Sequence, residues 1–385
     1  MAFADPSLYE KMVKHRRHLH ANPEVGIALP STHSYLALAL QDLGLETELH
    51  RAAGISAKIP GRQADLRPIV FRADMDALPV QEESHQSYRS QLDGAMHACG
   101  HDLHMATLLG VAEDLVANPP SRDVVVVFQP GEESDRGALE TLKHASLQID
   151  EAYVFAVHMH ATLPTGTIAY SRDVFMAYGD WFRLDIYGPG GHASAPERSG
   201  NPIQFGSRFE QGINTLAENL STNSERVVAT VTEFLSGNTV NVIPTHGSLR
   251  GTIRSVSSKQ RGELHRAMHD LAMNLELELN LQCQLEIIEG YPAVVSDSKF
   301  VDNLIEEASI RDCRMAFEEM ARPSMVIEDF SYFLQKWTGA MVYVGAAVGE
   351  NPAFNHSSSA KFDETAMDTA FGLFRILADS TNLGD

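Results

Sequence analysis

The sequence predicts an α/β protein whose central sheet is mixed but mainly parallel, with helices on both faces. Four short segments are apolar and largely β-branched or aromatic, as is typical of buried strands. They cover residues 68–71, 124–128, 153–157 and 341–344. A helical pattern at 103–116 falls between two of them, as expected when helices cover a parallel sheet. The middle of the chain has a different order of elements and predicts a second domain, of the α+β class.

The chain begins with two predicted helices. Residues 7–20 have the periodicity of an amphipathic helix, and Asn22 and Pro23 end it. Residues 32–43 form a second predicted helix, which ends at Gly44. Both helices belong to the first predicted domain.

The predicted elements in the middle of the chain follow the order β-α-β-β-α-β. The four strands cover 181–187, 226–234, 247–255 and 282–288, and the two helices cover 202–219 and 259–277. This order is typical of a ferredoxin-like domain. We therefore predict a domain at 178–289, inserted into a first domain made of residues 1–177 and 290–385.

The charge balance excludes some classes of partner. The chain has 385 residues, and its 30 basic and 51 acidic side chains give a net charge of −21. Nucleic acids and anionic membranes are bound by clustered Lys and Arg, so this balance argues against both partners. The composition, 44% hydrophobic and 21% charged, is typical of a globular protein, and the length favours two domains.

The cysteines and the N-terminus predict a cytoplasmic protein. Cys99, Cys283 and Cys313 are odd in number and far apart, which argues against a disulfide framework and favours a reducing compartment. The first 20 residues contain several charges and no apolar segment like the core of a signal peptide. No run of the chain approaches the roughly 18 apolar residues of a membrane span.

Side chains that bind metals or move protons follow the predicted strands of the first domain. In chain order they are Asp74 and Asp76, Glu132 and Glu133, His158 and His160, and finally His356. In open α/β sheets, ligands bind in the crevice beyond the carboxyl ends of the strands. The sequence therefore predicts a polar site at this edge of the sheet.

Cys99 and His101 are the first candidate metal ligands. They are two residues apart, so both side chains could face one metal ion on an extended or turning backbone. Thiolates, imidazoles and carboxylates are the groups that hold divalent transition metals in proteins. A Cys-Gly-His segment alone is weak evidence. It gains weight because acidic and histidine side chains follow the other predicted strands.

The pair Glu132 and Glu133 follows Pro130 and Gly131, where a turn is expected. Such a turn can point one carboxylate at a metal ion and leave the other to take a proton from water, which is the usual hydrolytic arrangement. The alternative is a pair of solvated acids in a loop. The buried strand just before the pair favours the first interpretation.

Short segments along almost the whole chain match one family in order. They are residues 17–20 with 22–24, 72–79, 97–102, 129–133, 190–193, 241–244, 251–254 and 328–331. In these segments the chain resembles the M20 metallopeptidase superfamily, specifically its amidohydrolase branch, subfamily D. That branch includes hippurate hydrolases, aminoacylases and hydrolases of auxin–amino acid conjugates. The resemblance implies a zinc-peptidase-like catalytic domain with an inserted lid and dimerisation domain, and hence a homodimer.

The resemblance also implies a metal centre. It would hold two divalent ions per subunit, of Zn, Mn, Co or Ni, with Cys99 as the bridge. The implied ligands are Cys99, His101, Glu133, His158 and His356. His97, Asp102, His104 and His160 are then expected to be supporting or structural residues.

Further roles follow from the same resemblance. Glu132 would be the general base that deprotonates the metal-activated water and passes the proton to the leaving amine, and Asp76 would orient a ligand imidazole. His192 would stabilise the oxyanion, from the partner subunit or after domain closure, with Asn241 as a second contact. Arg254 would bind the free carboxylate of the substrate. The structural alternatives are a plain loop residue for His192 and a surface charge at a strand end for Arg254.

Three departures from the family pattern surround the expected substrate pockets. Residues 134–137 replace a run of glycines, Glu197 replaces a common histidine, and Val326 and Ile327 replace a Gly-Ser pair. The resemblance therefore implies a reaction but no specific substrate.

The expected function is a metal-dependent amidohydrolase that cleaves N-acyl or N-aroyl amino acids to a free amino acid and a carboxylic acid. The first alternative is a dipeptidase, a carboxypeptidase or a deacetylase of an N-acetylated intermediate in the same superfamily. The second is a metal-binding sensor without catalysis, which the presence of Glu132 disfavours.

Overall fold

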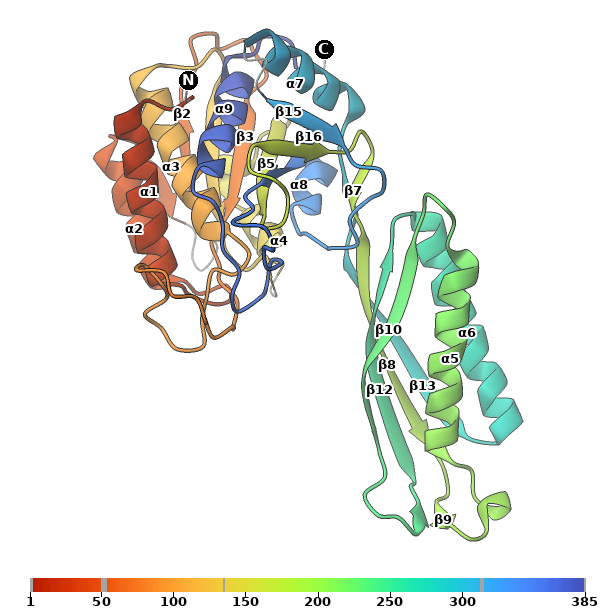
Figure 1. Ribbon diagram of the computed structural model, residues 1–385. Helices are drawn as coiled ribbons and strands as arrows, with labels where there is room; N and C mark the ends of the chain where they lie inside the picture. The colour runs from red at the N-terminus through yellow and green to blue at the C-terminus, as the bar shows by residue number, and fades with distance from the viewer. Residues whose placement is uncertain (1–2, 50–53, 134–135, 312–314, 384–385) are drawn as a thin grey trace. The chain divides into compact units, whose positions relative to one another are not determined.

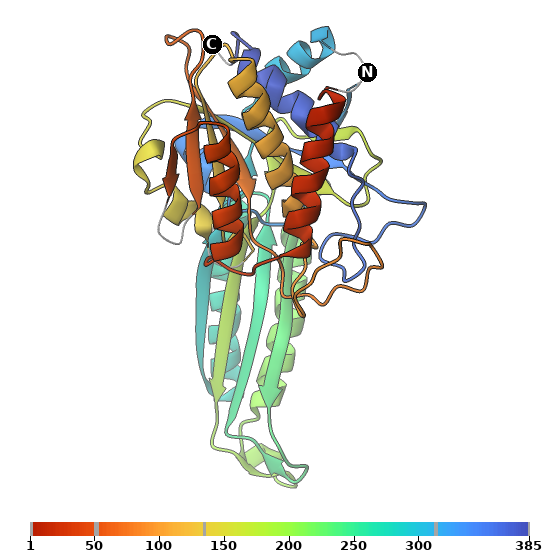
Figure 2. The ribbon, with the colours of Figure 1, turned by 90° about the vertical axis from the view of Figure 1, so that its left-hand side faces the viewer.

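The structure is a computed structural model that describes residues 3–49, 54–133, 136–311 and 315–383 (Figures 1 and 2). The chain forms two compact units. The first comprises Met1–Phe175, Val295–Ala321 and Glu328–Asp385, and the second comprises Met176–Val294 and Arg322–Ile327. The predicted lid and dimerisation roles of the inserted domain stay predictions. Cys313 and two of the departures from the family pattern, at residues 134 and 135, lie outside the described residues.

The first unit is built on a mixed sheet with the strand order β1-β2-β4-β3-β5-β16-β6-β15. The strands are β1 (Thr47–Leu49), β2 (Ile55–Ile59), β3 (Ile69–Asp74), β4 (Val124–Gln129), β5 (Tyr153–His160), β6 (Thr167–Tyr170), β15 (Ala316–Glu319) and β16 (Thr338–Gly345). The four central strands pair in parallel. Antiparallel pairs join β1 to β2, β2 to β4 and β16 to β6. The predicted fold class, a mainly parallel mixed sheet, is confirmed.

Helices bury both faces of this sheet. They are α1 (Pro6–Ala21), α2 (Pro30–Asp42), α3 (His101–Ala117), α4 (Gly137–Thr141), α7 (Ser298–Arg311), α8 (Ser331–Lys336) and α9 (Ala366–Asp379), with a short 3-10 helix at Ala145–Leu147. Helix α3 packs between α1 and α9 and against β3 and β5, while α8 packs on β16 and α4 (Figure 1). Every residue of β3 and β4 is buried, which explains their near-continuous apolar sequences.

The side chains of β3 alternate between the two faces of the sheet. Ile69, Phe71 and Ala73 join the main hydrophobic core of the unit, which includes apolar side chains of α3 and α9. Arg72 and Asp74 therefore point to the opposite face. This alternation places charged groups at the carboxyl end of a fully buried strand.

The second unit is an antiparallel sheet with both long helices on one face (Figure 1). Its strand order is β10-β12-β8-β13, from β8 (Tyr178–Tyr187), β10 (Val227–Ser236), β12 (His246–Ser255) and β13 (Gln282–Tyr291), with helices α5 (Pro202–Leu220) and α6 (Ser258–Leu279). Apolar side chains from these elements form a separate core. The predicted β-α-β-β-α-β order is confirmed.

Small elements complete the two units. A two-stranded ladder joins β9 (Gly191–His192) to β11 (Val242–Ile243), and a 3-10 helix covers Pro196–Arg198. A second ladder pairs β7 (Val174–Met176) with β14 (Val294–Val295), where the chain passes between the units. In the part of the chain that the structure describes, no helix has the length and apolar character needed to cross a membrane.

Candidate metal centre

The carboxyl ends of the parallel strands bring the predicted metal ligands together in the first unit. The segment after β4 carries Glu132 and Glu133, and His158 lies near the end of β5. Cys99 and His101 flank Gly100, which adopts a left-handed conformation with φ 90° at the start of α3. Parallel strands end at one edge of a sheet, so segments far apart in the chain converge there.

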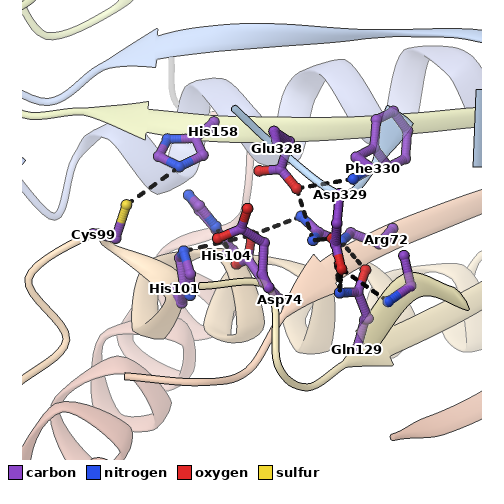
Figure 3. Close-up of polar contacts among 12 residues, drawn as sticks. Arg72, Asp74, Cys99, His101, His104, Gln129, His158, Glu328, Asp329 and Phe330 are labelled. Carbon is purple, nitrogen blue, oxygen red and sulfur yellow. Dashed lines mark hydrogen bonds and ion pairs between the residues drawn. The ribbon is translucent and has the colours of Figure 1, made fainter. Parts of the chain in front are cut away.

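Cys99 lies beside His158 and close to His101 (Figure 3). Its Sγ atom is 3.4 Å from Nε2 of His158 and 3.2 Å from Nε2 of His356. Among the described residues, several groups of side chains have ligand atoms close enough together to hold a metal ion, and Cys99 belongs to two of them. One group is Cys99, His101 and His158, and the other is Cys99, Glu133 and His356.

The histidines of the cluster offer the correct nitrogen to a metal ion. His101 donates from Nδ1 to the carbonyl oxygen of Asp76 at 2.8 Å, and His158 donates from Nδ1 to that of Met159 at 3.0 Å. A hydrogen bond of this kind fixes the tautomer and leaves the Nε2 lone pair for a metal ion. Nε2 of His101 is buried and has no hydrogen-bond partner among the described residues.

The electrostatics of the cluster also fit divalent cations. Burial lowers the pKa of His101 and of His158, which keeps both imidazoles in the neutral form that metals bind. Burial, together with nearby carboxylates, raises the pKa of the Cys99 thiol well above its usual value. A bound cation would reverse that effect and stabilise the thiolate. The residues present therefore fit a metal pair.

His356 is held in place through its backbone. Its N–H donates to the carbonyl oxygen of Ala98 at 2.9 Å, and its φ of 71° is unusual for a residue other than glycine. The preceding Asn355 donates to the carbonyl of Met159 at 3.0 Å. Nε2 of His356 lies 3.3 Å from Oε1 of Glu133. Backbone conformations of this kind persist where the surroundings fix them, and they cluster at functional sites.

Asp76 supports the cluster in two ways. Its carboxylate accepts the backbone N–H groups of Glu132 and Glu133, each at 3.0 Å. Its backbone carbonyl, and not its carboxylate, accepts the close hydrogen bond from His101. The side chain of Asp76 therefore fixes the acidic pair, while its main chain orients the imidazole.

His104 is close to the cluster but has no nitrogen left for a metal ion. Its Nδ1 donates to Asp74 at 2.6 Å, and its Nε2 accepts the backbone N–H of Met159 at 2.8 Å. Asp74, His101 and His104 do have ligand atoms close together. Because both ring nitrogens of His104 are used, the contacts give it a supporting role.

Glu132 lies beside the ligands in a buried, acidic environment. Its carboxylate is close to those of Glu328 and Asp329. Burial raises the pKa of Glu132 well above its usual value, and the neighbouring carboxylates raise it further. A carboxylate whose pKa is raised in this way is a better proton acceptor than an exposed one.

Arg72, Gln129, Glu328 and Asp329, which had no predicted role, form a buried polar network with Asp74 (Figure 3). Arg72 donates to Asp74 at 2.6 Å, to Glu328 and Asp329 at 3.0 Å each, and to Gln129 at 2.9 Å. Burial raises the pKa of Glu328 to about 8, despite the charge of Arg72. For Arg72, Gln129, Glu328 and Asp329, the sequence signal was their position inside the segments 72–79, 129–133 and 328–331.

The remaining predicted site residues lie in the second unit. His192 is exposed in β9, which pairs with β11, and the carbonyl of Asn241 accepts the N–H of Ala193 at 3.1 Å. The ladder therefore brings His192 and Asn241 to one end of this unit. Arg254 lies in β12 and donates to the carbonyl of Ile253 at 2.9 Å. The catalytic and binding roles of these three residues stay predictions.

Comparisons with known proteins agree with this geometry. Residues 70–380 match the model of peptidase family M20/M25/M40. Thermostable carboxypeptidase 2 of Saccharolobus solfataricus is 31% identical over 92% of this chain and 91% of its own length. N-acetyldiaminopimelate deacetylase of Oenococcus oeni is 30% identical over 93% of this chain and 94% of its own.

A solved structure is also similar. It is the Bacillus subtilis protein described as a dinuclear metal binding peptidase from the M20 family, with a TM-score of 0.84 and 28% identity. The match covers 97% of this chain and 98% of that one. The chain therefore belongs to peptidase family M20/M25/M40, and it is a metal-dependent hydrolase of amide or peptide bonds.

Proposed function

We propose that the protein is an N-acyl-amino acid amidohydrolase, which releases a free amino acid and a carboxylic acid from N-acyl or N-aroyl amino acids. The observation that carries the proposal is the buried cluster around Cys99, with Glu132 beside it. The family relative named N-acetyldiaminopimelate deacetylase supports an N-acyl substrate. We also propose that the chain belongs to the subfamily D branch, as its short segments imply.

The proposed centre takes two divalent ions of Zn, Mn, Co or Ni, held by Cys99, His101, Glu133, His158 and His356. Such ions, when bound, lower the pKa of water and polarise the amide carbonyl. Glu132 accepts the proton of the attacking water and delivers it to the nitrogen of the leaving amine. Asp76 holds the backbone of Glu132 in place during both transfers.

Residues of the second unit complete the proposal. His192 and Asn241 donate hydrogen bonds to the oxyanion of the tetrahedral intermediate, whose charge such donors stabilise. Arg254 binds the free carboxylate of the amino acid, because a planar guanidinium matches a carboxylate with two parallel hydrogen bonds. We further propose that the protein is cytoplasmic and that the second unit forms a homodimer. Light scattering of the purified protein tests the dimer.

The second candidate function is a carboxypeptidase or dipeptidase. The relative named thermostable carboxypeptidase 2 favours it. Both candidate functions use the same chemistry and a substrate with a free carboxylate. They differ in the group on the other side of the scissile amide, which is an acyl group in one and an aminoacyl group in the other.

A substrate panel with metal-stripped protein distinguishes the candidates. The panel contains N-acetyl, N-benzoyl and longer N-acyl amino acids together with matched dipeptides, each with and without added Mn, Zn, Co or Ni. We expect metal-dependent release of amino acid from the acyl substrates. Faster turnover of the dipeptides would favour the second candidate. Stoichiometric metal binding without turnover of any substrate would refute both.

A further inference from the structure

A backbone hydrogen bond connects the two described parts of the segment that carries Glu132. We define the base loop as residues 129–133 and 136–138. The N–H of Gly137 donates to the carbonyl of Gly131 at 3.1 Å, which brings the two ends of the loop together. A Cβ atom on Gly137 would lie 1.6 Å from the carbonyl oxygen of Pro130, so this position has no room for a side chain.

One buried carboxylate binds both ends of the base loop. Asp329 is fully buried and accepts the backbone N–H of Ala138 at 2.9 Å. The side-chain amide of Gln129 lies 2.9 Å from each oxygen of the same carboxylate. Arg72 of β3 donates to it at 3.0 Å. Asp329 therefore connects the last residue of β4, the start of α4 and the neighbouring strand (Figure 3).

Two aspartates thus hold the base loop from different sides. Asp76 accepts the N–H groups of Glu132 and Glu133 at the middle of the loop, whereas Asp329 holds the two ends. Asp76 follows β3, and Asp329 comes from the segment before α8, more than half of the chain away. Each aspartate therefore contacts a separate part of the loop.

We propose that Asp329 is a positioning residue for the reaction, which holds the ends of the base loop so that the Glu132 carboxylate stays at the reacting water. This inference rests on the proposed function of Glu132. Asp329 is not one of the predicted metal ligands, and its carboxylate lies close to that of Glu132. It holds the loop through Gln129 and Ala138. Its effect is therefore on the chemical step, and substrate and metal affinity are left nearly unchanged.

The chemistry of the contacts explains why an aspartate is needed. Donors from Arg72, Gln129 and Ala138 all converge on Asp329, and a carboxylate only accepts hydrogen bonds at neutral pH. In Asp329→Asn an amide NH₂ would face at least one of these donors and lose that contact. The side chain keeps its size, but the variant also removes a negative charge close to Glu132. Gln129→Ala, which keeps that charge and removes a contact to Asp329, is therefore measured beside it.

The test compares Asp329→Asn with wild type in steady-state kinetics, metal content and hydrogen exchange. We expect kcat to fall about 10- to 100-fold, because a displacement of about 1 Å in a catalytic group costs about that much. KM should stay within about twofold and the metal content unchanged, because the variant acts on the chemical step. Amide exchange at residues 129–133 and 136–141 should become faster.

A matched control tests whether the replacement of another aspartate that accepts backbone N–H groups has the same effect. Asp368 also accepts backbone N–H groups, from Phe3 and Ala4, and belongs to α9. Asp368→Asn should leave kcat and exchange in the base loop at wild-type values. A kcat of Asp329→Asn within twofold of wild type would overturn the proposal. Loss of metal from this variant would also overturn it, because Asp329 would then support the metal centre itself.

Two further measurements test the proposal if Asp329→Asn does not fold or if wild type has no activity. If Asp329→Asn does not fold, Gln129→Ala replaces it, because that variant removes one donor and keeps the carboxylate. It should lower kcat with KM unchanged, and a wild-type kcat would overturn the proposal. If wild type cleaves no amide or dipeptide, the proposed function fails by itself. Hydrogen exchange then decides the inference, and unchanged protection of the base loop in Asp329→Asn would refute it.

Discussion

His101 and His158 offer the same nitrogen to the cluster because a main-chain carbonyl fixes the other nitrogen of each ring. His104 has both nitrogens occupied, although it lies in the same helix as His101 and only three residues away. The difference between a ligand and a supporting histidine is thus set by hydrogen-bond partners. No spacing in the sequence reports the partners of His101 and His104, because they come from β3, from the segment after it and from β5.

Glu132 is expected to act as a base and not as a metal ligand. The substitution Glu132→Gln keeps the size and hydrogen bonding of the side chain but removes its ability to accept a proton. We expect kcat to fall by about 10²- to 10⁴-fold, the usual contribution of general base catalysis. Metal content, measured by elemental analysis of the purified variant, should match wild type. A variant that loses metal would show instead that Glu132 is a ligand.

Arg254 is expected to recognise the carboxylate of the substrate. Burial lowers its pKa, and the main-chain contacts of its guanidinium leave donors for a ligand. Arg254→Ala should raise KM about 10- to 100-fold for N-acyl amino acids, the value of a hydrogen bond to a charged group. The corresponding N-acyl amino acid amides are the control substrates. If KM rises equally for acids and amides, Arg254 does not bind the carboxylate.

At the scale of elements, burial explains which parts of the fold could be predicted. Strands β3, β4 and β5 are buried on both faces, so their sequences are apolar and easily recognised. The strands β1 and β15 are short and lie at the edges of the sheet with exposed residues. Their sequences carry little hydrophobic pattern, and they were not predicted.

The same reasoning applies to the elements around the metal centre. The predicted ligands follow recognisable strands, so their convergence could be foreseen from the parallel sheet. Glu328 and Asp329 follow no such strand, and they meet Arg72 only because the chain returns to the first unit some 256 residues later. Long-range packing of this kind leaves no local signal in a single sequence.

The link between β8 and α6 predicts a pH dependence of stability in the second unit. Asp180 of β8 accepts hydrogen bonds from Arg261 at 2.8 Å and 2.6 Å, from His265 at 2.8 Å and from the N–H of Gly290 at 2.9 Å. Burial alone would raise the pKa of Asp180, but these donors hold it well below its usual value. The carboxylate therefore stabilises the folded state when it is ionised.

The sign of the effect follows from this lowered pKa. The contribution is fully present above the unfolded pKa of about 3.9 and is lost as the pH falls below it, because the unfolded state then binds the proton more readily. Asp180→Asn should be less stable than wild type near neutral pH, and the difference should shrink below about pH 4. Urea unfolding measures this difference in stability at each pH. Hydrogen exchange in β8 and α6 shows whether the loss of stability lies at these elements. A constant difference across the pH range would exclude the contribution of Asp180.

At the scale of the whole molecule, the two units have separate cores, and the predicted site residues are divided between them. The candidate metal ligands all belong to the first unit, whereas the predicted oxyanion and carboxylate contacts belong to the second. A sequence can predict such a division because the order of elements changes in the middle of the chain. It cannot predict which buried contacts stabilise each unit, because those depend on side chains that are distant in sequence.

This division predicts which unit loses stability when the metal is removed. A ligand that binds only the folded state stabilises it by about 2.7 kcal/mol when its free concentration is 100 times Kd. Because Cys99, His101 and Glu133 join α3 to the segment after β4, chelation should speed amide exchange in α3 and β3–β5 of the first unit. Exchange in β8, β12 and α6 should not change. Cys99→Ser, which lacks the shared thiolate, is the matched variant, and its exchange should respond little to chelator. Equal deprotection of both units would mean that the metal stabilises the protein as one cooperative body, while no change in wild type would argue against a metal centre at Cys99.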